Sequence, residues 1–256
     1  MQIVLIVLAV VGVVFSPAAP VRAAEITVAA SPAVEQGLRA AAQVFAGETG
    51  HKFAFVFIPS QQIRRAIRAS EVFDLIVVPP PAMRELINMK KVTGEGVNLG
   101  RVGVGVAVRA GAPVPVVADW GSLAAAIVKA ESLVFSRSAA GLYIESLLKE
   151  KKLWTQVESK VTRYVVPGEV IEHVLRGRGN ELAFAAITVI LATRQRGVQY
   201  AGPLPPEVQR FTAYAAAPMV ASRQQRLAEV FAQFLVSSQG RALLEASGIQ
   251  PPAASN

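Results

Sequence analysis

Hydrophobic positions along the chain alternate between short β-type runs and longer segments with helical spacing. The first unit starts with Ile26-Thr27-Val28 and continues with apolar residues three or four apart between Val34 and Phe45. At the junction, Ser31 occupies the position of a helix N-cap and Pro32 suits the first helical position. This stretch predicts a strand, a tight turn and a helix whose first backbone N–H groups have no partner within the helix.

The same unit recurs along the chain. Residues 52–57 alternate as in a strand and Ser60 then begins a helical segment, while residues 73–78 form a continuous apolar run typical of a buried strand. Further strands are predicted at residues 132–135, 161–166 and 181–187, and further helices at residues 142–151, 170–176, 188–196 and 223–246. Strands that alternate with helices predict parallel sheets with right-handed crossovers.

Two long β-prone stretches indicate how the chain is divided. Residues 102–108, which are interrupted by glycines, and residues 210–221 are each predicted to cross between two domains. We therefore predict an α/β fold of two lobes joined by crossing strands, with a ligand cleft between them. Lobe one is expected to comprise residues 24–103 plus 213–256, and lobe two residues 104–212.

The N-terminus has the pattern of a secretory signal peptide. The apolar run from Ile3 to Phe15 is too short to span a membrane comfortably, and Val21-Arg22-Ala23 fits a cleavage site before Ala24. We expect residues 1–23 to be a signal peptide and the protein to be periplasmic. An uncleaved anchor is the alternative, because Met1-Gln2 supplies no basic region.

Composition and charge narrow the function further. The chain has 256 residues, of which 52% are hydrophobic, and it has no cysteine, which excludes disulfides, thiolate metal sites and a thiol nucleophile. The formal net charge is +8, but the basic residues are scattered along the sequence. Nucleic-acid binding requires a clustered basic patch, so we predict no nucleic-acid partner.

The sequence contains no recognisable catalytic motif. His51 and His173 are the only histidines and lack metal-ligand spacing, and no G-x-S-x-G, P-loop or H-E-x-x-H motif occurs. Asp74, at the start of an apolar run, is predicted to accept structural hydrogen bonds rather than bind a cation. We predict no enzyme, no metal and no cofactor. A secreted hydrolase is a further hypothesis that needs a nucleophile–base pair in the cleft.

Several motifs, taken in order, resemble a known family. They are I-T-V-A-A-S at 26–31, F-x-x-S at 57–60, F-D-L-I-V-V at 73–78, A-A-G-L-Y at 139–143 and P-G-E-V at 167–170. This order and spacing resemble the periplasmic molybdate-binding proteins of ABC transporters. The resemblance implies a type II periplasmic-binding-protein-like fold that captures a small oxyanion for a membrane permease. We expect the protein to be a monomer.

The resemblance also implies where the oxyanion would be bound. Ser31 and Ser60 of lobe one would donate hydroxyl and backbone hydrogen bonds, and Ala140 and Val170 of lobe two would donate backbone N–H groups. Unpaired N–H groups and the helix dipole favour an anion by about 0.3–1 kcal/mol at each exposed helix end. From the residues alone, Ser31 and Ser60 are equally well interpreted as ordinary helix N-caps.

One position departs from the family pattern. The family has a tyrosine in lobe two where this chain has Ala186. Loss of such a donor lowers affinity about ten- to a hundredfold. Two ligand hypotheses therefore stand: a molybdate- or tungstate-like oxyanion, or a small organic solute in the same fold, which would then serve in transport, as a sensor or as an interaction module. A cavity much larger than an oxyanion and lined by apolar groups would favour the organic solute.

Overall fold

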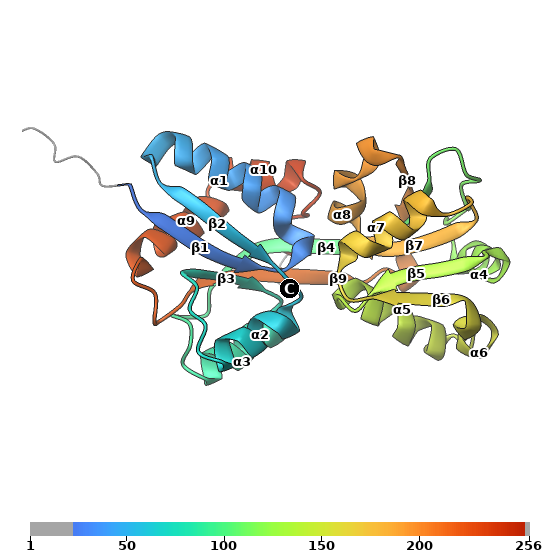
Figure 1. Cartoon of the computed structure of the whole chain (residues 1–256), viewed down its shortest axis with the longest axis horizontal. Helices are drawn as coiled ribbons and strands as arrows, with labels where there is room; N and C mark the ends of the chain where they lie inside the picture. Colours follow the sequence, from blue (N-terminus) through green and yellow to red (C-terminus); the bar gives the residue numbers. More distant parts are fainter. Residues whose placement is uncertain (1–22, 254–256) are drawn as a thin grey trace, which may run out of the picture.

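Two lobes of α/β structure lie side by side and are joined by two long strands, β4 (Val97–Arg109) and β9 (Phe211–Pro218) (Figure 1). This computed structural model describes residues 23–253. The predicted signal peptide lies outside the described residues apart from Ala23. No helix within residues 23–253 combines the length and apolar character needed to cross a membrane. The two-lobed α/β fold predicted from the sequence is confirmed.

Lobe one is built on strands β1, β2 and β3 with β9 and the first half of β4. Its sheet order is β2-β1-β3-β9-β4, and β1 pairs in parallel with both β2 and β3. The elements of this lobe are β1 (Glu25–Ala30), η1 (Pro32–Val34), α1 (Glu35–Thr49), β2 (Lys52–Phe57), α2 (Ser60–Arg68), β3 (Leu75–Val78), α3 (Pro80–Asn88), α9 (Gln225–Val236) and α10 (Ser238–Ala246).

Lobe two repeats this plan with β5 at its centre. Strand β5 pairs in parallel with β6 and β7, and β7 and β8 both pair with the second half of β4. The elements of this lobe are α4 (Trp120–Lys129), β5 (Ser132–Ser136), α5 (Ala139–Glu150), α6 (Trp154–Val157), η2 (Glu158–Lys160), β6 (Val161–Tyr164), α7 (Pro167–Arg176), β7 (Glu181–Ala186), α8 (Ile187–Ala192), η3 (Arg194–Arg196), β8 (Val198–Pro203) and η4 (Pro206–Val208).

Strand β4 changes partners where the chain passes between the lobes. Up to Gly103 it pairs with β9, and from Val104 onward it pairs with β7. All pairings of β4 and β9 are antiparallel, so the prediction of parallel pairing holds for β1 with β2 and β3 and for β5 with β6 and β7. At Gly103 a Cβ atom would lie 3.1 Å from the Phe211 ring and 3.2 Å from Ile187, which favours glycine at this crossing.

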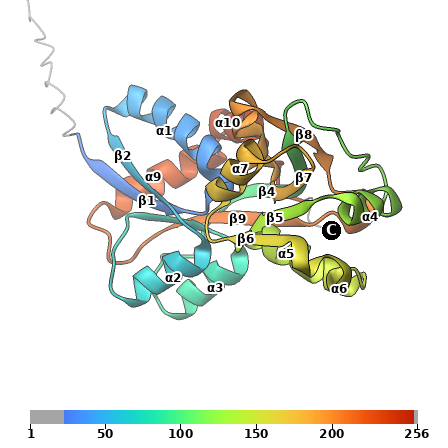
Figure 2. The ribbon, with the colours of Figure 1, turned by 45° about the vertical axis from the view of Figure 1, so that its right-hand side comes forward.

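Helices cover both faces of each sheet because apolar residues recur along one side of each helix. In lobe one, α1 and α10 lie on one face and α2 and α3 on the other, as both ribbon views show (Figures 1 and 2). The first layer buries Leu38 and Phe45 against Phe231, and the second buries Ile63 beside Met83. Burial of such side chains stabilises the fold by about 1.5–3 kcal/mol each.

The C-terminal helical segment differs from the prediction. The sequence predicts one helix over residues 223–246 with a possible interruption at Gly240, whereas the structure has two helices, α9 and α10, separated at Ser237. The Ser237 hydroxyl accepts a hydrogen bond from the Gly240 N–H and thereby caps α10. A Cβ atom at Gly240 would lie 2.0 Å from the Phe234 carbonyl oxygen, so glycine permits this close turn.

Candidate functional site

A largely enclosed cavity lies between the two lobes where the crossing strands pass. Its volume is about 130 Å³, roughly ten times the 10–15 Å³ that one water molecule requires. Most of its lining residues are apolar. They are Ser31, Pro32, Ala33, Pro59, Ser60, Gln61, Pro79, Val102, Gly103, Val104, Arg137, Ser138, Ala139, Ala140, Leu142, Pro167, Ala186, Val189, Thr212 and Tyr214.

Ser31 follows β1 and faces this cavity with its hydroxyl free. The side chain is 6% exposed and does not cap the short helix η1 that it precedes. Its backbone N–H is already used, because it donates to the Val77 carbonyl oxygen at 3.0 Å. The expectation that both the hydroxyl and the amide of Ser31 are available is therefore corrected: only the hydroxyl is.

Ser60 begins helix α2 on the same side of the cavity. The helix has Pro59 at its N-cap position, and no side chain caps it. The first backbone N–H group of this helix that donates a hydrogen bond within the helix is that of Gln62, which donates to the Pro59 carbonyl oxygen. The amides of Ser60 and Gln61 thus lie at an uncapped helix N-terminus, with the Ser60 hydroxyl beside them.

Ala140 reaches the cavity from lobe two, in the first turn of α5. Ser138 holds the N-cap position of this helix without capping it, and its hydroxyl instead accepts from the Ser136 hydroxyl at 2.9 Å. The turn is tight because a Cβ atom on Gly141 would lie 1.7 Å from the Ser136 carbonyl oxygen. The N-terminus of α5 therefore faces the cavity with free amides, opposite the N-terminus of α2.

Val170 is the one predicted residue that the structure does not bring to the cavity. Its side chain is fully buried in the core of lobe two, on helix α7. The part of α7 that lines the cavity is Pro167, three residues earlier. Proline has no N–H group, so this helix contributes an apolar ring where an amide donor was expected. Ala186 does line the cavity, and the tyrosine of the family pattern is accordingly absent there.

Two cavity-lining residues that can contact a ligand, Tyr214 and Arg137, were missed in the sequence. Tyr214 lies on the crossing strand β9 and lines the cavity while being only 4% exposed. Burial raises the pKa of its phenol far above the ordinary value, so the group remains a hydrogen-bond donor at neutral pH. Because Tyr214 sits in an alternating β-type run, nothing local distinguishes it from a core residue.

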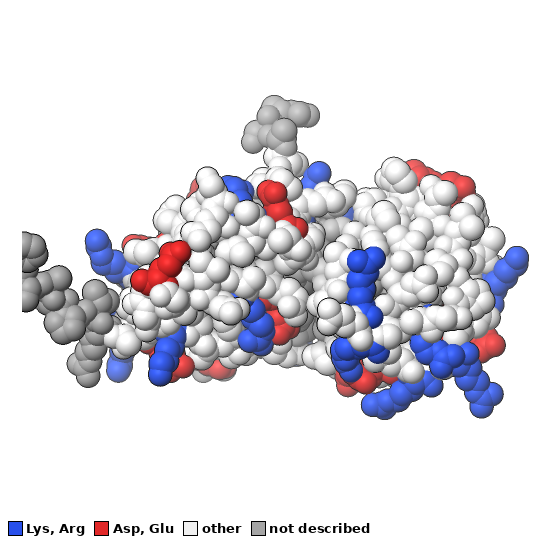
Figure 3. Space-filling model, turned by 90° about the horizontal axis from the view of Figure 1, so that it is seen from above, with Lys and Arg blue, Asp and Glu red and all other residues white. Residues whose placement is uncertain are grey.

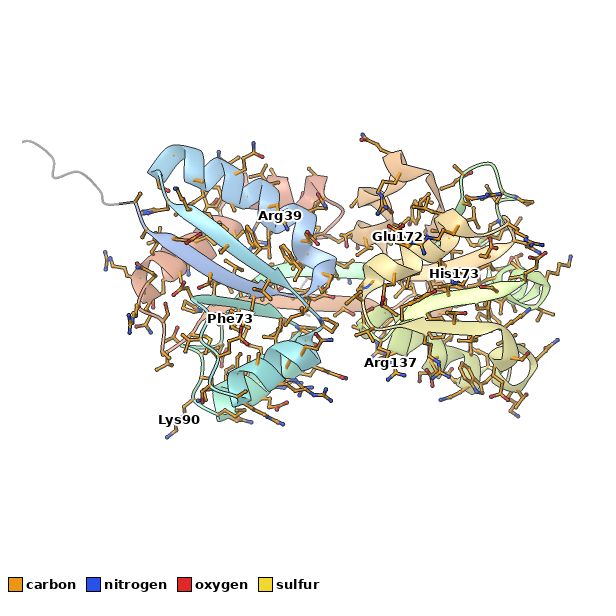
Figure 4. All side chains as sticks on the ribbon, viewed as in Figure 1. Arg39, Phe73, Lys90, Arg137, Glu172 and His173 are labelled. Carbon is orange, nitrogen blue, oxygen red and sulfur yellow. The ribbon has the colours of Figure 1, made fainter. Side chains whose placement is uncertain are left out.

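Arg137 is the second missed residue. It lies between β5 and α5 (Figure 4), is exposed, and belongs to the lining of the cavity. Its backbone N–H donates to the Tyr164 carbonyl oxygen at 2.8 Å, which fixes the loop that carries it. The signal available in the sequence was a basic residue between two serines, directly between a strand and a helix start.

The charge of the cavity lining favours an anion. Among the described lining residues Arg137 is the only charged side chain, and no Asp, Glu, His or Lys is present. Asp74 lies elsewhere, as predicted, and accepts hydrogen bonds from the Thr27 amide, the Thr27 hydroxyl and the Ser222 hydroxyl. On the face seen in Figure 3, basic and acidic residues occur over both lobes, and Lys and Arg side chains gather along the lower edge of the right-hand lobe.

A serine–histidine pair exists, but outside the cavity. The Ser132 hydroxyl lies 3.2 Å from His173 Nε2, and the Tyr164 hydroxyl lies 3.0 Å from Nδ1 of the same ring. The labelled His173 and Glu172 belong to α7 in lobe two (Figure 4). Neither Ser132 nor His173 lines the interlobe cavity, so the nucleophile–base pair that a hydrolase would need there is absent from its described lining. Within residues 23–253 no group of acidic or histidine side chains is arranged to hold a metal ion.

The family model for bacterial extracellular solute-binding proteins matches residues 26–250. This match spans both lobes and the cavity between them. The chain belongs to the bacterial extracellular solute-binding protein family.

Solved structures share the fold of this solute-binding protein. The periplasmic molybdate-binding protein of Azotobacter vinelandii has a TM-score of 0.73 and 15% sequence identity, covering 89% of this chain and 99% of that one. The sulfate-binding protein SubI from Mycobacterium tuberculosis H37Rv has a TM-score of 0.71 and 19% identity, covering 90% and 88%. The similarity establishes the fold, and the different ligands in these names leave the ligand of this chain open.

A protein named as an enzyme, not as a binding protein, is also similar to this chain over most of its length. The aconitate isomerase of a Pseudomonas species is 25% identical over 232 residues, which cover 88% of this chain and 87% of the relative. The family thus includes binding proteins, while this relative leaves an enzymatic activity open for the chain.

Proposed function

We propose that this solute-binding protein works in the periplasm. It captures a small oxygen-bearing anion between its lobes and delivers it to the membrane permease of an ABC importer. One observation supports the proposal above all. The hydroxyls of Ser31 and Ser60 and the uncapped N-terminus of α2 from lobe one line the same cavity as the uncapped N-terminus of α5 from lobe two. Helix N-termini that converge in this way favour negative charge.

The proposal relies on neutral donors more than on a counter-charge. Hydroxyls and amides recognise oxygen atoms of molybdate, tungstate, sulfate, phosphate or a carboxylate alike, so the class of ligand is an oxyanion in the broad sense. Arg137 adds one guanidinium at the cavity, which strengthens binding of any of these groups. The missing phenol at Ala186 and the size of the cavity weaken the case for molybdate in particular.

We further propose that the protein binds its ligand without transforming it. Isomerisation of a carboxylic acid such as aconitate moves a proton, and a general base must be within hydrogen-bond reach of that proton. The described lining holds no carboxylate, imidazole or amine. Incubation with cis-aconitate, followed by proton NMR, is expected to leave the substrate unchanged; conversion to the trans isomer would overturn this part of the proposal.

Thermal unfolding of the purified protein with a panel of anions tests the binding function. Molybdate, tungstate, sulfate, phosphate and succinate form the panel, and choline is the cationic control. An anion at a hundredfold excess over its dissociation constant stabilises the protein by about 2.7 kcal/mol, which raises the melting temperature by roughly 5–11 °C. If choline stabilises the protein and no anion does, the assignment to anions is wrong.

A further inference from the structure

The lining of the interlobe cavity combines deeply buried residues, which we call its buried end, with exposed residues, which we call its solvent-facing end. At the buried end lie the Ser31 hydroxyl and the Tyr214 phenol, both from lobe one and both less than a tenth exposed. At the solvent-facing end lie Arg137 and Leu142 of lobe two, and Leu142 is 47% exposed. A ligand that fills the cavity would therefore contact neutral hydrogen-bond donors at the buried end and a guanidinium at the solvent-facing end.

The Tyr214 hydroxyl points to a bound acceptor. Tyr214 lines the cavity and is 4% exposed, its hydroxyl makes no hydrogen bond with any of the residues that the structure describes, and its oxygen is not among the fully buried polar atoms, so it is accessible from the cavity. A hydroxyl that opens into a cavity without a protein partner is available to donate a hydrogen bond to an occupant. An anionic oxygen at the buried end would satisfy this phenol together with the Ser31 hydroxyl.

The walls of the cavity favour carbon atoms in the occupant. Val102 and Val104 on β4 are almost completely buried, and Ala186 and Val189 line the cavity from lobe two. A tetrahedral oxyanion, with one central atom and its oxygens, fills only part of 130 Å³ and leaves these walls facing water. A short hydrocarbon chain covers them and removes apolar surface from water, at about 25 cal/mol per Å² buried.

The charge of the cavity lining favours organic acids over amines and amino acids. No carboxylate lines the described cavity, so the ammonium group of an amine or amino acid would be left without a counter-charge. The planar fork of Arg137 matches a carboxylate with two parallel hydrogen bonds. Arg137 forms no direct ion pair with an acidic residue of the described chain, although its charge helps to lower the pKa of Glu145, so its guanidinium hydrogen bonds remain available to an incoming acid.

We infer that the preferred occupant is a short organic dicarboxylate, with one carboxylate at Ser31 and Tyr214 and the other at Arg137. The inference rests on the proposed function, since it names the class of anion that the same cavity holds. Because the two ends belong to different lobes, a two-headed anion also bridges lobe one to lobe two.

Calorimetric titration with succinate, butyrate and molybdate tests the inference. Succinate and butyrate have carbon chains of the same length and differ in the second carboxylate. Hydrogen bonds to a charged group typically change affinity about ten- to a hundredfold, so succinate is expected to bind tighter than butyrate by that factor. Molybdate is expected to bind more weakly than succinate.

Two variants test which residues bind each carboxylate of the ligand, and a third variant is the control. Arg137→Gln is expected to abolish most of the advantage of succinate and to leave butyrate affinity within about twofold. Tyr214→Phe keeps the ring and removes only the hydroxyl, so it is expected to weaken succinate and butyrate by similar factors. Arg39→Gln is the matched control, because Arg39 pairs with Glu35 at 2.9 Å in lobe one and does not line the cavity.

The outcomes separate this inference from the proposed function. Tightest binding of molybdate, or equal losses of succinate and butyrate affinity in Arg137→Gln, overturns the dicarboxylate and leaves anion binding standing. If neither succinate nor any other anion of the panel binds the folded protein, both the inference and the proposed function fail.

Discussion

The Thr188 hydroxyl donates a 2.6 Å hydrogen bond to the carbonyl oxygen of Ala33. Thr188 is the second residue of helix α8 in lobe two, and Ala33 lies in η1 of lobe one, two residues after Ser31. Both residues are buried. The lobes are therefore joined by a side-chain hydrogen bond next to the cavity, in addition to the two crossing strands.

Thr188→Val is expected to favour a more open arrangement of the lobes. Valine keeps the shape of threonine and removes the hydroxyl, so a hydrogen bond worth about 0.5–1.5 kcal/mol is lost only in the closed form. The radius of gyration of the ligand-free protein, measured by X-ray scattering, should increase. The apparent affinity for the best-binding anion should fall about two- to tenfold, in proportion to the closed fraction.

Thr193→Val provides the matched control for that experiment. The Thr193 hydroxyl donates only to carbonyl oxygens of its own helix segment, those of Val189 and Ile190. This variant should leave scattering and affinity as they are in the natural chain. Unchanged scattering and affinity in Thr188→Val would show that its hydrogen bond does not hold the lobes together.

Ser31→Ala distinguishes a ligand donor from a helix cap. Because the Ser31 hydroxyl makes no capping bond, its loss should change the free energy of unfolding by less than about 0.5 kcal/mol. Anion affinity should fall about two- to tenfold, as expected for one neutral hydrogen bond. Chemical denaturation and calorimetry measure the two effects separately.

Ser237→Ala should behave in the opposite way. The Ser237 hydroxyl accepts from the Gly240 N–H at the start of α10, and loss of such a cap typically costs about 1 kcal/mol. Ser237 does not line the cavity, so anion affinity should be unchanged. If Ser31→Ala lowers stability as Ser237→Ala does and leaves affinity intact, Ser31 is a structural residue.

Asp74→Ala is expected to destabilise the fold without affecting binding. The Asp74 carboxylate accepts from the Thr27 amide at 2.8 Å, the Thr27 hydroxyl at 2.7 Å and the Ser222 hydroxyl at 2.6 Å. Donors left unsatisfied in a buried site cost about 1–3 kcal/mol each. Glu71→Ala, at an exposed carboxylate nearby, should stay within about 0.5 kcal/mol. Lost anion binding in folded Asp74→Ala would contradict this assignment.

Local patterns sufficed for much of the fold and for part of the site. The junction at Ser31 is recognisable because a β-branched run, a serine and a proline follow one another, and the junction at Ser60 has a similar pattern. The structure places both junctions, together with Ala140, at one cavity. The role of Asp74 was also predictable, since a carboxylate at the start of a buried strand needs donors close by.

The rest of the site depends on contacts between distant segments. Tyr214 reaches the cavity because β9 pairs with β4 in a particular register, which places Tyr214 opposite Gly100. Neither the register nor the bulge beside Gly100 follows from local periodicity. Val170 was expected at the cavity from the resemblance, but the start of α7 is set by Pro167, three residues earlier. The pair formed by Ser132 and His173 joins β5 to α7 and has no local signature either.

Glu181→Gln should reduce stability at neutral pH and have less effect in acid. Burial would raise the pKa of Glu181, but hydrogen bonds from the backbone N–H groups of Gly179 and Arg178 outweigh it and hold the pKa below 4.5, the ordinary value. A group whose pKa is lowered by folding contributes stability above its unfolded pKa. That contribution disappears as the pH falls through the folded pKa.

The difference in the free energy of unfolding between the natural chain and Glu181→Gln should therefore be greatest near pH 7, at about 1.5–3 kcal/mol for hydrogen bonds to a charged group. It should shrink steadily below pH 4.5 as the carboxylate of the natural chain becomes protonated. Urea denaturation at a series of pH values measures this difference in the free energy of unfolding. Glu229→Gln, on the exposed side of α9, is the control for simple loss of charge. A difference that stays constant with pH would mean that Glu181 acts through its shape and not through its charge.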